Sequence, residues 1–279
     1  MKMTGSFSPI IKIAKYTLSD EVRQKSFIVM FVICALFILM VRGCYRGDYM
    51  VNGQEVEAAK VVMMVSKITF HVIAAGVMFL AALLSMRVFR RDRDEGTQSC
   101  ILSKPINRWQ YVAGRILGLW ILSVAFMFVL HGIVFIITSV KLNAVMPEYL
   151  FASLLCSFNL LFVVIAVLLF SLMMPDIAAL LLIIGAGITG LVADGIFAMS
   201  RSPMGQAVLQ THAPSGMTLW QVVYYLWPKL SGTQSFAASF IGADGMGATA
   251  PVYPLMNIII YCLVLGALLF WYFNKEDIT

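Results

Sequence analysis

Charge is what this 279-residue sequence has least of, since Asp, Glu, Lys and Arg together make up only 12% of it. Soluble domains carry about 25% charged residues. Hydrophobic residues account for 61% of the chain, and its mean hydropathy is +0.89. This composition excludes an ordinary soluble protein and predicts an integral membrane protein.

A nucleotide-binding motif is also missing, because the sequence contains no G-x-x-x-x-G-K-[ST] phosphate-binding loop. No polar stretch is long enough to form a separate nucleotide-binding or nucleic-acid-binding domain. The formal net charge of +6 therefore indicates cationic loops on the cytoplasmic side of a membrane, and no nucleic-acid partner.

Signals for metal binding or catalysis are equally sparse. None of the five cysteines belongs to a C-x-x-C pair, and neither His71 nor His131 has a neighbour at metal-ligand spacing. The eighteen methionines are scattered and are typical of apolar packing. Asp176, Asp194 and Asp244 suggest no acid pair for hydrolysis. We therefore expect no metal, no bound cofactor and no catalytic residue in this chain.

Long apolar runs dominate the rest of the sequence. A helix needs about 20 residues to cross a hydrocarbon core about 30 Å thick. The segments that can span lie at residues 26–42, 61–86, 112–140, 150–173, 177–199 and 252–273. They predict an all-α polytopic membrane protein whose six transmembrane helices form one domain over residues 26–279.

The segment before the first span is amphipathic. Its charged residues lie mostly between apolar residues that recur at steps of three and four, namely Phe7, Ile10, Ile11, Ala14, Leu18 and Val22. Such a helix is too charged to span and should lie along the membrane surface. We therefore expect an N-terminal amphipathic helix over residues 1–25, as an elbow that carries force into the first span, with a generic surface anchor as the alternative.

Lysine and arginine are distributed unequally between the two sides of this predicted bundle. If both termini are cytoplasmic, the inner side holds 13 of them and the outer side 7. The positive-inside rule favours that orientation. The membrane is expected to be the cell (inner) membrane. The long outer connection, residues 200–251, is rich in proline, glycine and interfacial aromatic residues. It predicts re-entrant or interfacial helices, with a small folded cap as the alternative.

Polar residues are concentrated in one inner loop, residues 87–115, which holds ten of the chain's 34 charged side chains. The second span is expected to continue into this loop as a charged helix and to stop at Gly96. Thr97 can cap a short helix that Pro105 ends, and Asn107 can cap the next span. A helix of one or two turns is not stable alone, so it must dock on this chain or on a cytoplasmic partner.

Three short motifs follow one another in this loop, before Gly114-Arg115: RDRDEGT at 91–97, ILSKP at 101–105 and NRWQY at 107–111. Together with the charged C-terminal tail after Leu269, they resemble type-2 ABC exporter permeases, of the branch that includes the nitrous oxide reductase maturation permease. Gln98 and Cys100 depart from the family pattern, in which leucine or acidic residues are common at these places.

The resemblance implies a permease subunit of an ATP-driven exporter. ATP and Mg would be bound by a separate ABC ATPase subunit, and a second permease subunit would complete a homodimer or heterodimer surrounded by membrane lipid. Residues 97–103 would match the coupling helix. The residues expected to couple to the ATPase are Arg91, Arg93, Glu95, Gly96, Thr97, Ile101, Leu102, Pro105 and Arg108. The alternative is a non-transporting scaffold or assembly factor that binds a partner through the same loop.

Small residues mark two of the predicted spans. Gly114 and Gly118 form a G-x-x-x-G motif at the start of the third span, and Gly185, Gly187 and Gly190 lie in the fifth. Glycines at such positions let helices approach closely in lipid. We interpret them as packing sites within the subunit, with a dimer seam as the alternative.

Overall fold

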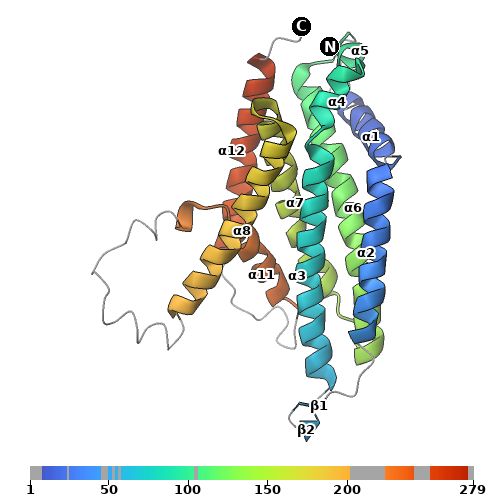
Figure 1. The fold of residues 1–279 in the computed structure, drawn as a ribbon, viewed down its shortest axis with the longest axis vertical. Coiled ribbons are helices and arrows are strands. Elements are labelled where there is room, and N and C mark those ends of the chain that lie inside the picture. The colour runs from blue at the N-terminus through green and yellow to red at the C-terminus, as the bar shows by residue number, and fades with distance from the viewer. Residues whose placement is uncertain are drawn as a thin grey trace, which may run out of the picture.

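The computed structural model describes residues 8–23, 25–44, 50–51, 54–55, 58–103, 106–201, 224–241 and 252–275. Within these ranges the chain is helical apart from turns and one short strand pairing (Figure 1). The long helices run roughly side by side and form one elongated bundle. The prediction of an all-α, multi-pass membrane protein is confirmed at this level.

Five helices in the described part are long and apolar enough to cross a membrane. They are α3 (Ala58–Ser85) with its continuation α4, α6 (Arg108–Leu142), α7 (Glu148–Met173), α8 (Asp176–Arg201) and α12 (Tyr253–Lys275). The first predicted span coincides with α2 (Lys25–Cys44), an apolar helix of 20 residues. The count of six spans depends on α2 and stays a prediction.

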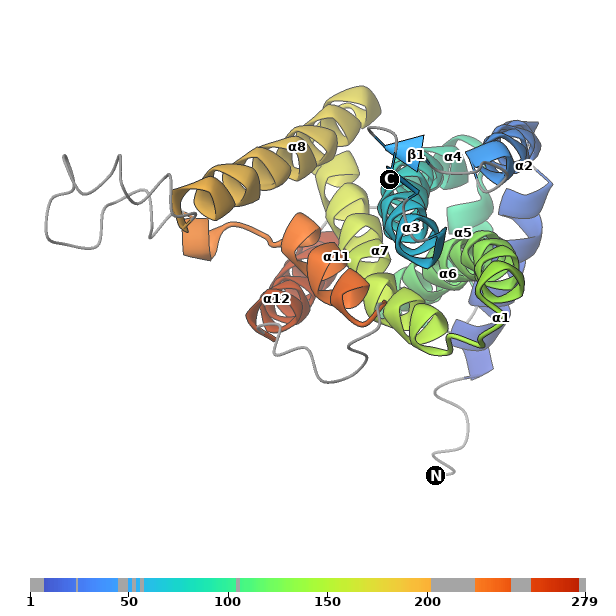
Figure 2. The ribbon, with the colours of Figure 1, turned by 90° about the horizontal axis from the view of Figure 1, so that it is seen from below.

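α7 lies at the centre of the bundle, because α3, α6, α8, α11 and α12 all pack against it. In its apolar stretch 72% of the residues are buried, whereas only 22% are buried in that of α8. A helix that is apolar on all sides is stable inside a bundle, where neighbours cover every face. α8 is therefore a peripheral helix, and Figure 2 shows it extending away from the others.

The amphipathic N-terminal segment forms α1 (Ser8–Val22). Its apolar face, with Ile10, Ile13 and Ala14, is buried, and the helix packs chiefly against α6. In the connection between α2 and α3, two-residue strands β1 (Met50–Val51) and β2 (Gln54–Glu55) form an antiparallel pair.

The outer connection predicted over residues 200–251 contains a helix that the bundle surrounds. α11 (Leu230–Ser239) packs against α7, α8, α12 and α3, and Thr233 and Ala237 are completely buried. The Asn159 side chain donates a hydrogen bond to the Leu230 carbonyl at 2.9 Å, which ties α11 to the central helix. Residues 202–223 and 242–251 of this connection lie outside the described residues.

The loop between α3 and α6 folds into two short helices. α3 ends at Ser85, a turn at Met86 and Arg87 follows, and α4 (Val88–Asp94) begins. The sequence predicts a continuous helix here, but the turn lets Val88 and Phe89 enter the core. Burial of these two apolar side chains favours the break.

α5 (Thr97–Leu102) is the short helix expected after the charged segment. Gly96 ends α4 with a φ of 67°, a left-handed conformation that glycine adopts without steric cost. Its carbonyl accepts the Cys100 N–H at 3.1 Å, so Gly96 caps α5 and Thr97, the expected cap, is the first helical residue. Asn107 caps α6, and its N–H donates to Gln110 Oε1 at 3.1 Å. The Leu102 side chain and Pro105 lie outside the described residues.

Candidate functional site at the junction of α1, α4 and α6

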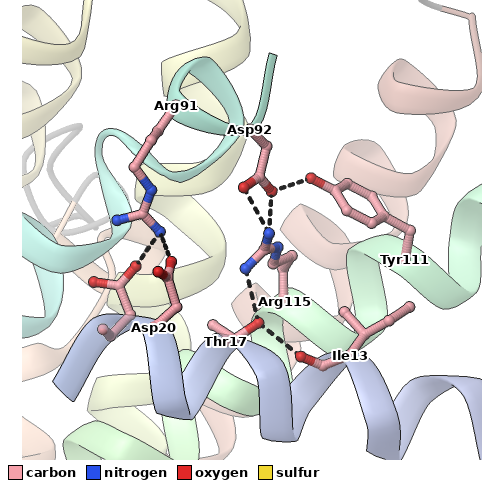
Figure 3. Close-up of polar contacts among 8 residues, drawn as sticks. Ile13, Thr17, Asp20, Arg91, Asp92, Tyr111 and Arg115 are labelled. Atoms are coloured by element: carbon pink, nitrogen blue, oxygen red, sulfur yellow. Dashed lines mark hydrogen bonds and ion pairs between the residues drawn. The ribbon is translucent and has the colours of Figure 1, made fainter. Parts of the chain in front are cut away.

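A buried ion pair joins α4 to α6 (Figure 3). Arg115 is completely buried and Asp92 is 1% exposed. Nη2 of Arg115 lies 2.6 Å from Oδ1 and 2.5 Å from Oδ2 of Asp92. The Tyr111 hydroxyl, one turn earlier on α6, donates a hydrogen bond to Oδ2 of the same carboxylate. Both charges are therefore removed from solvent and neutralise each other, as buried ions must.

The same arginine also holds α1. Its Nη1 donates to the Thr17 hydroxyl at 3.0 Å, and that hydroxyl donates to the Ile13 carbonyl at 2.9 Å. The guanidinium lies 5.2 Å from the centre of the Tyr16 ring and 5.7 Å from that of Tyr111. Contacts of this kind with aromatic faces add to the stabilisation of a cation. Arg115 therefore connects three helices that are remote in sequence.

A second arginine attaches α4 to the C-terminal turn of α1 (Figure 3). Nη2 of Arg91 lies 2.5 Å from Asp20 Oδ2 and 2.7 Å from Glu21 Oε1. Burial raises the pKa of Glu21 above its ordinary value of 4.5, and the nearby Arg91 charge opposes that rise without cancelling it. Two carboxylates near the C-terminus of a helix are unfavourable, and Arg91 offsets the effect.

Glycine at two positions of α6 allows α1 to approach closely enough for these bonds. A Cβ at Gly114 would lie 2.7 Å from Ile13 Cβ, and a Cβ at Gly118 would lie 2.6 Å from Thr17 Cβ. No larger residue fits at either place unless α1 moves. The G-x-x-x-G motif thus lies in a contact within the subunit.

The glycines of α8 are in a different situation. A Cβ at Gly185 or Gly187 would meet no atom within 4 Å, and one at Gly190 would make an ordinary contact with Trp227 at 3.5 Å. Glycine therefore permits close helix packing at 114 and 118, whereas at 185 and 187 it makes no close helix contact within the subunit.

The end of α12 completes the junction. The Phe273 ring lies 5.3 Å from that of Phe89 on α4 and 5.7 Å from that of Tyr111 on α6. Arg108, at the start of α6, donates from Nη1 to the Asn274 carbonyl at 3.2 Å. Four helices, α1, α4, α6 and α12, are therefore joined at the end of the bundle that carries α5 (Figure 1).

α5 has an inner and an outer side. Gln98 is 2% exposed and Ile101 is half-buried against the core of this chain, whereas Cys100 and Ser103 are exposed. The short helix thus docks partly on its own chain, through Gln98 and Ile101. Its outer side remains accessible in the single subunit.

Of the nine residues expected to couple to an ATPase, the seven whose side chains the structure describes do not all face the same side. Arg91 points toward α1, Arg108 binds the end of α12 and Ile101 packs inward. Arg93 and Glu95 are exposed, while Gly96 and Thr97 are half-buried at the turn between α4 and α5. These residues lie at the same end of the bundle, on different sides of α4 and α5.

No place in a buried junction was predicted for the residues that form it, although Asp92, Tyr111 and Arg115 lie within the motifs that carry the resemblance. Thr17, Glu21, Asp92, Tyr111 and Arg115 are the ones missed. A signal existed, since Tyr111 and Arg115 are four residues apart and share one face of a helix. An arginine inside an otherwise apolar helix also requires an acidic partner, but the sequence does not say which of the neighbouring acids provides it.

His131 has a structural role in the bundle. Its Nδ1 is 2.7 Å from the Ser153 hydroxyl oxygen, and its ring stacks on Phe70 with centroids 4.6 Å apart. Among the residues that the structure describes, no group of three or more His, Cys, Asp or Glu side chains could hold a metal ion.

Comparison with known protein families gives a match that covers most of the chain. The sequence model of the family described as "ABC-2 family transporter protein" matches residues 11–278, nearly the whole chain. None of the curated proteins matches this chain significantly.

Proposed function

Because the chain belongs to the ABC-2 family of transporter proteins, we propose that it is the permease subunit of an ATP-driven exporter. Family membership makes it a membrane transport component without catalytic residues of its own. The proposal adds that a separate ABC ATPase binds at α5 and that ATP hydrolysis there moves a substrate outward. Membership of the nitrous oxide reductase maturation branch stays a prediction from the loop sequence.

The observation that carries this proposal is the buried ion pair between Asp92 and Arg115. It fixes α4, and with it α5, to the start of α6. Closely packed, hydrogen-bonded elements transmit displacement because they cannot be compressed. A push on α5 would therefore move α4 and α6 together instead of being absorbed in a flexible loop.

The same junction gives α1 a part in coupling. Because Arg91 and Arg115 both bond to α1, the amphipathic helix moves with α4 and α6. In the proposed arrangement both termini are cytoplasmic, α1 is the elbow helix at the inner membrane surface, and α2 is the first of six spans. A second permease subunit would provide the other wall of the transport path.

The exposed thiol of Cys100 offers a direct test of ATPase binding. Among the cysteines whose side chains the structure describes, Cys100 alone is exposed, Cys34 is half-buried, and Cys156 and Cys262 are buried. We expect maleimide to modify Cys100 rapidly in the isolated permease and slowly in native membranes, where the ATPase covers α5. The C100S variant measures labelling at other cysteines.

A gentle detergent pull-down with mass spectrometry tests the partner's identity. We expect a stoichiometric partner chain that contains a Walker A motif. In the Leu102→Asp variant this partner should be absent, and Cys100 should no longer be protected from maleimide. Recovery of intact, folded protein with no ATPase, and with Cys100 equally reactive in membranes, would overturn the proposal in favour of a scaffold role.

A further inference from the structure

A cavity of about 250 Å³ lies between α3, α7, α8 and α11. Its floor consists of buried apolar side chains, including Ala82, Val163 and Leu230. Its mouth is lined by Phe79 of α3 and Leu191 of α8, which are exposed on the apolar surface of the subunit. The cavity therefore leads from that surface to the central helix.

Ser231 and Gln234 are the polar side chains in the cavity lining. The Gln234 amide group points its Nε2 toward the Met78 sulfur, 3.9 Å away. A water molecule needs two to four polar partners to be held in a cavity. Ordered water is poorly supported here, while an empty space would forfeit the dispersion contacts of its walls.

The position of α8 creates this space. Few residues of its apolar stretch are buried, and Figure 2 shows it diverging from α3 and α7. Gly187 lines the cavity, and a Cβ there would meet no atom within 4 Å. Gly185 is equally open but does not line the cavity. Glycine at 187 thus keeps the cavity open without making a close helix contact.

We propose that this cavity binds one acyl chain of a membrane phospholipid. The mouth lies on the surface of two helices of membrane-spanning length and composition, so bilayer hydrocarbon is the medium that meets it. A cavity whose walls are mostly apolar, with only two polar side chains, suits a hydrocarbon chain better than water or an ion. The site is independent of the proposed ATPase coupling and can be tested on the permease alone.

The test uses the purified full-length permease in nanodiscs that contain a phospholipid with a diazirine near the end of one acyl chain. After illumination, peptide mass spectrometry locates the adducts. We expect adducts on the floor, at Val163 and Leu230, in addition to those on lipid-facing residues. G187F abolishes the floor adducts because its ring fills the cavity, whereas the matched G185F variant retains them.

A second variant fills the cavity from the opposite wall, so that the test does not depend on α8 alone. Ala82→Leu should also remove the floor adducts while the melting temperature and the elution volume show a folded protein. Floor adducts that are absent in the unmodified chain, or that persist equally in G187F and G185F, would overturn the proposal. Floor labelling by a free diazirine fatty acid and none by the phospholipid would also overturn it.

Discussion

Asp92 of α4 and Arg115 of α6 form an ion pair whose closest atoms, Oδ2 and Nη2, are 2.5 Å apart, and neither residue is more than 1% exposed. They are 23 residues apart in sequence, across the α5 turn. A buried pair of this kind is weak evidence for net stabilisation, but loss of one member leaves an uncompensated charge. Substitution of either residue therefore tests the junction directly.

Arg115→Met should destabilise the folded protein strongly, because Asp92 would remain buried without its cation. We expect a loss of about 3–5 kcal/mol, seen as a lower melting temperature in detergent. The double variant D92N/R115M should recover part of the loss, since no buried charge remains. Equal melting temperatures for R115M and the unmodified chain would contradict the buried pair.

Gly118→Leu should displace α1 from α6, because a Cβ at this position would lie 2.6 Å from Thr17 Cβ. Overpacking of this kind costs about 1–3 kcal/mol. The control is Gly132→Leu on the same helix, where a Cβ meets no atom within 4 Å. Limited proteolysis within α1 should be faster in G118L and unchanged in G132L, and equal rates would contradict the close contact.

Two adjacent arginines should differ in their contribution to stability. Arg90 pairs with Asp176 at 3.2 Å, and its own side chain is 62% exposed. Asp176 is 8% exposed but is the first residue of α8, where the helix dipole stabilises a carboxylate, so Arg90→Gln should cost at most about 1 kcal/mol. Arg91→Gln removes charged hydrogen bonds to Asp20 and the buried Glu21 and should cost about 1.5–3 kcal/mol. Melting curves of the two variants side by side provide the measurement, and the reverse order would contradict the inward orientation of Arg91.

The stability of the α1 contact should depend on pH through Glu21. Because burial raises the pKa of Glu21, the folded protein holds this proton more tightly than the unfolded chain. This contribution is fully present below the ordinary value of about 4.5 and is lost as the pH rises through the raised pKa. The variant E21Q should show a flatter dependence of melting temperature on pH over that window. Identical slopes would show that Glu21 does not titrate with a raised pKa.

Most expectations for the loop between α3 and α6 that rest on local signals were accurate, although Thr97, expected to cap α5, is its first residue. Gly96 ends α4 as its type and position suggest, and Asn107 begins α6. The break at Met86 and Arg87 was not predicted, because it depends on the burial of Val88 and Phe89 against helices elsewhere in the chain. That break sets which face of α4 carries Asp92 toward Arg115.

The role of Arg91 illustrates the same limit. In the sequence it lies in a charged segment, where an arginine is equally compatible with contact to a partner protein and with contact to this chain. In this structure it binds α1, and its contact with an ATPase stays a prediction. The distance between residues 20 and 91 cannot be read from the sequence, because it depends on how the helices pack.

By itself the sequence determined the helical class, the positions of the long helices, the charged loop and the resemblance to a transporter family. These follow from runs of neighbouring residues, since apolar length and glycine or proline signals act locally. Only the tertiary structure decided that α1 packs on Gly114 and Gly118, that Asp92 neutralises Arg115, and that α11 enters the bundle. The bond between Arg115 and Thr17 joins residues 98 positions apart, and such contacts arise from the simultaneous burial of several helices.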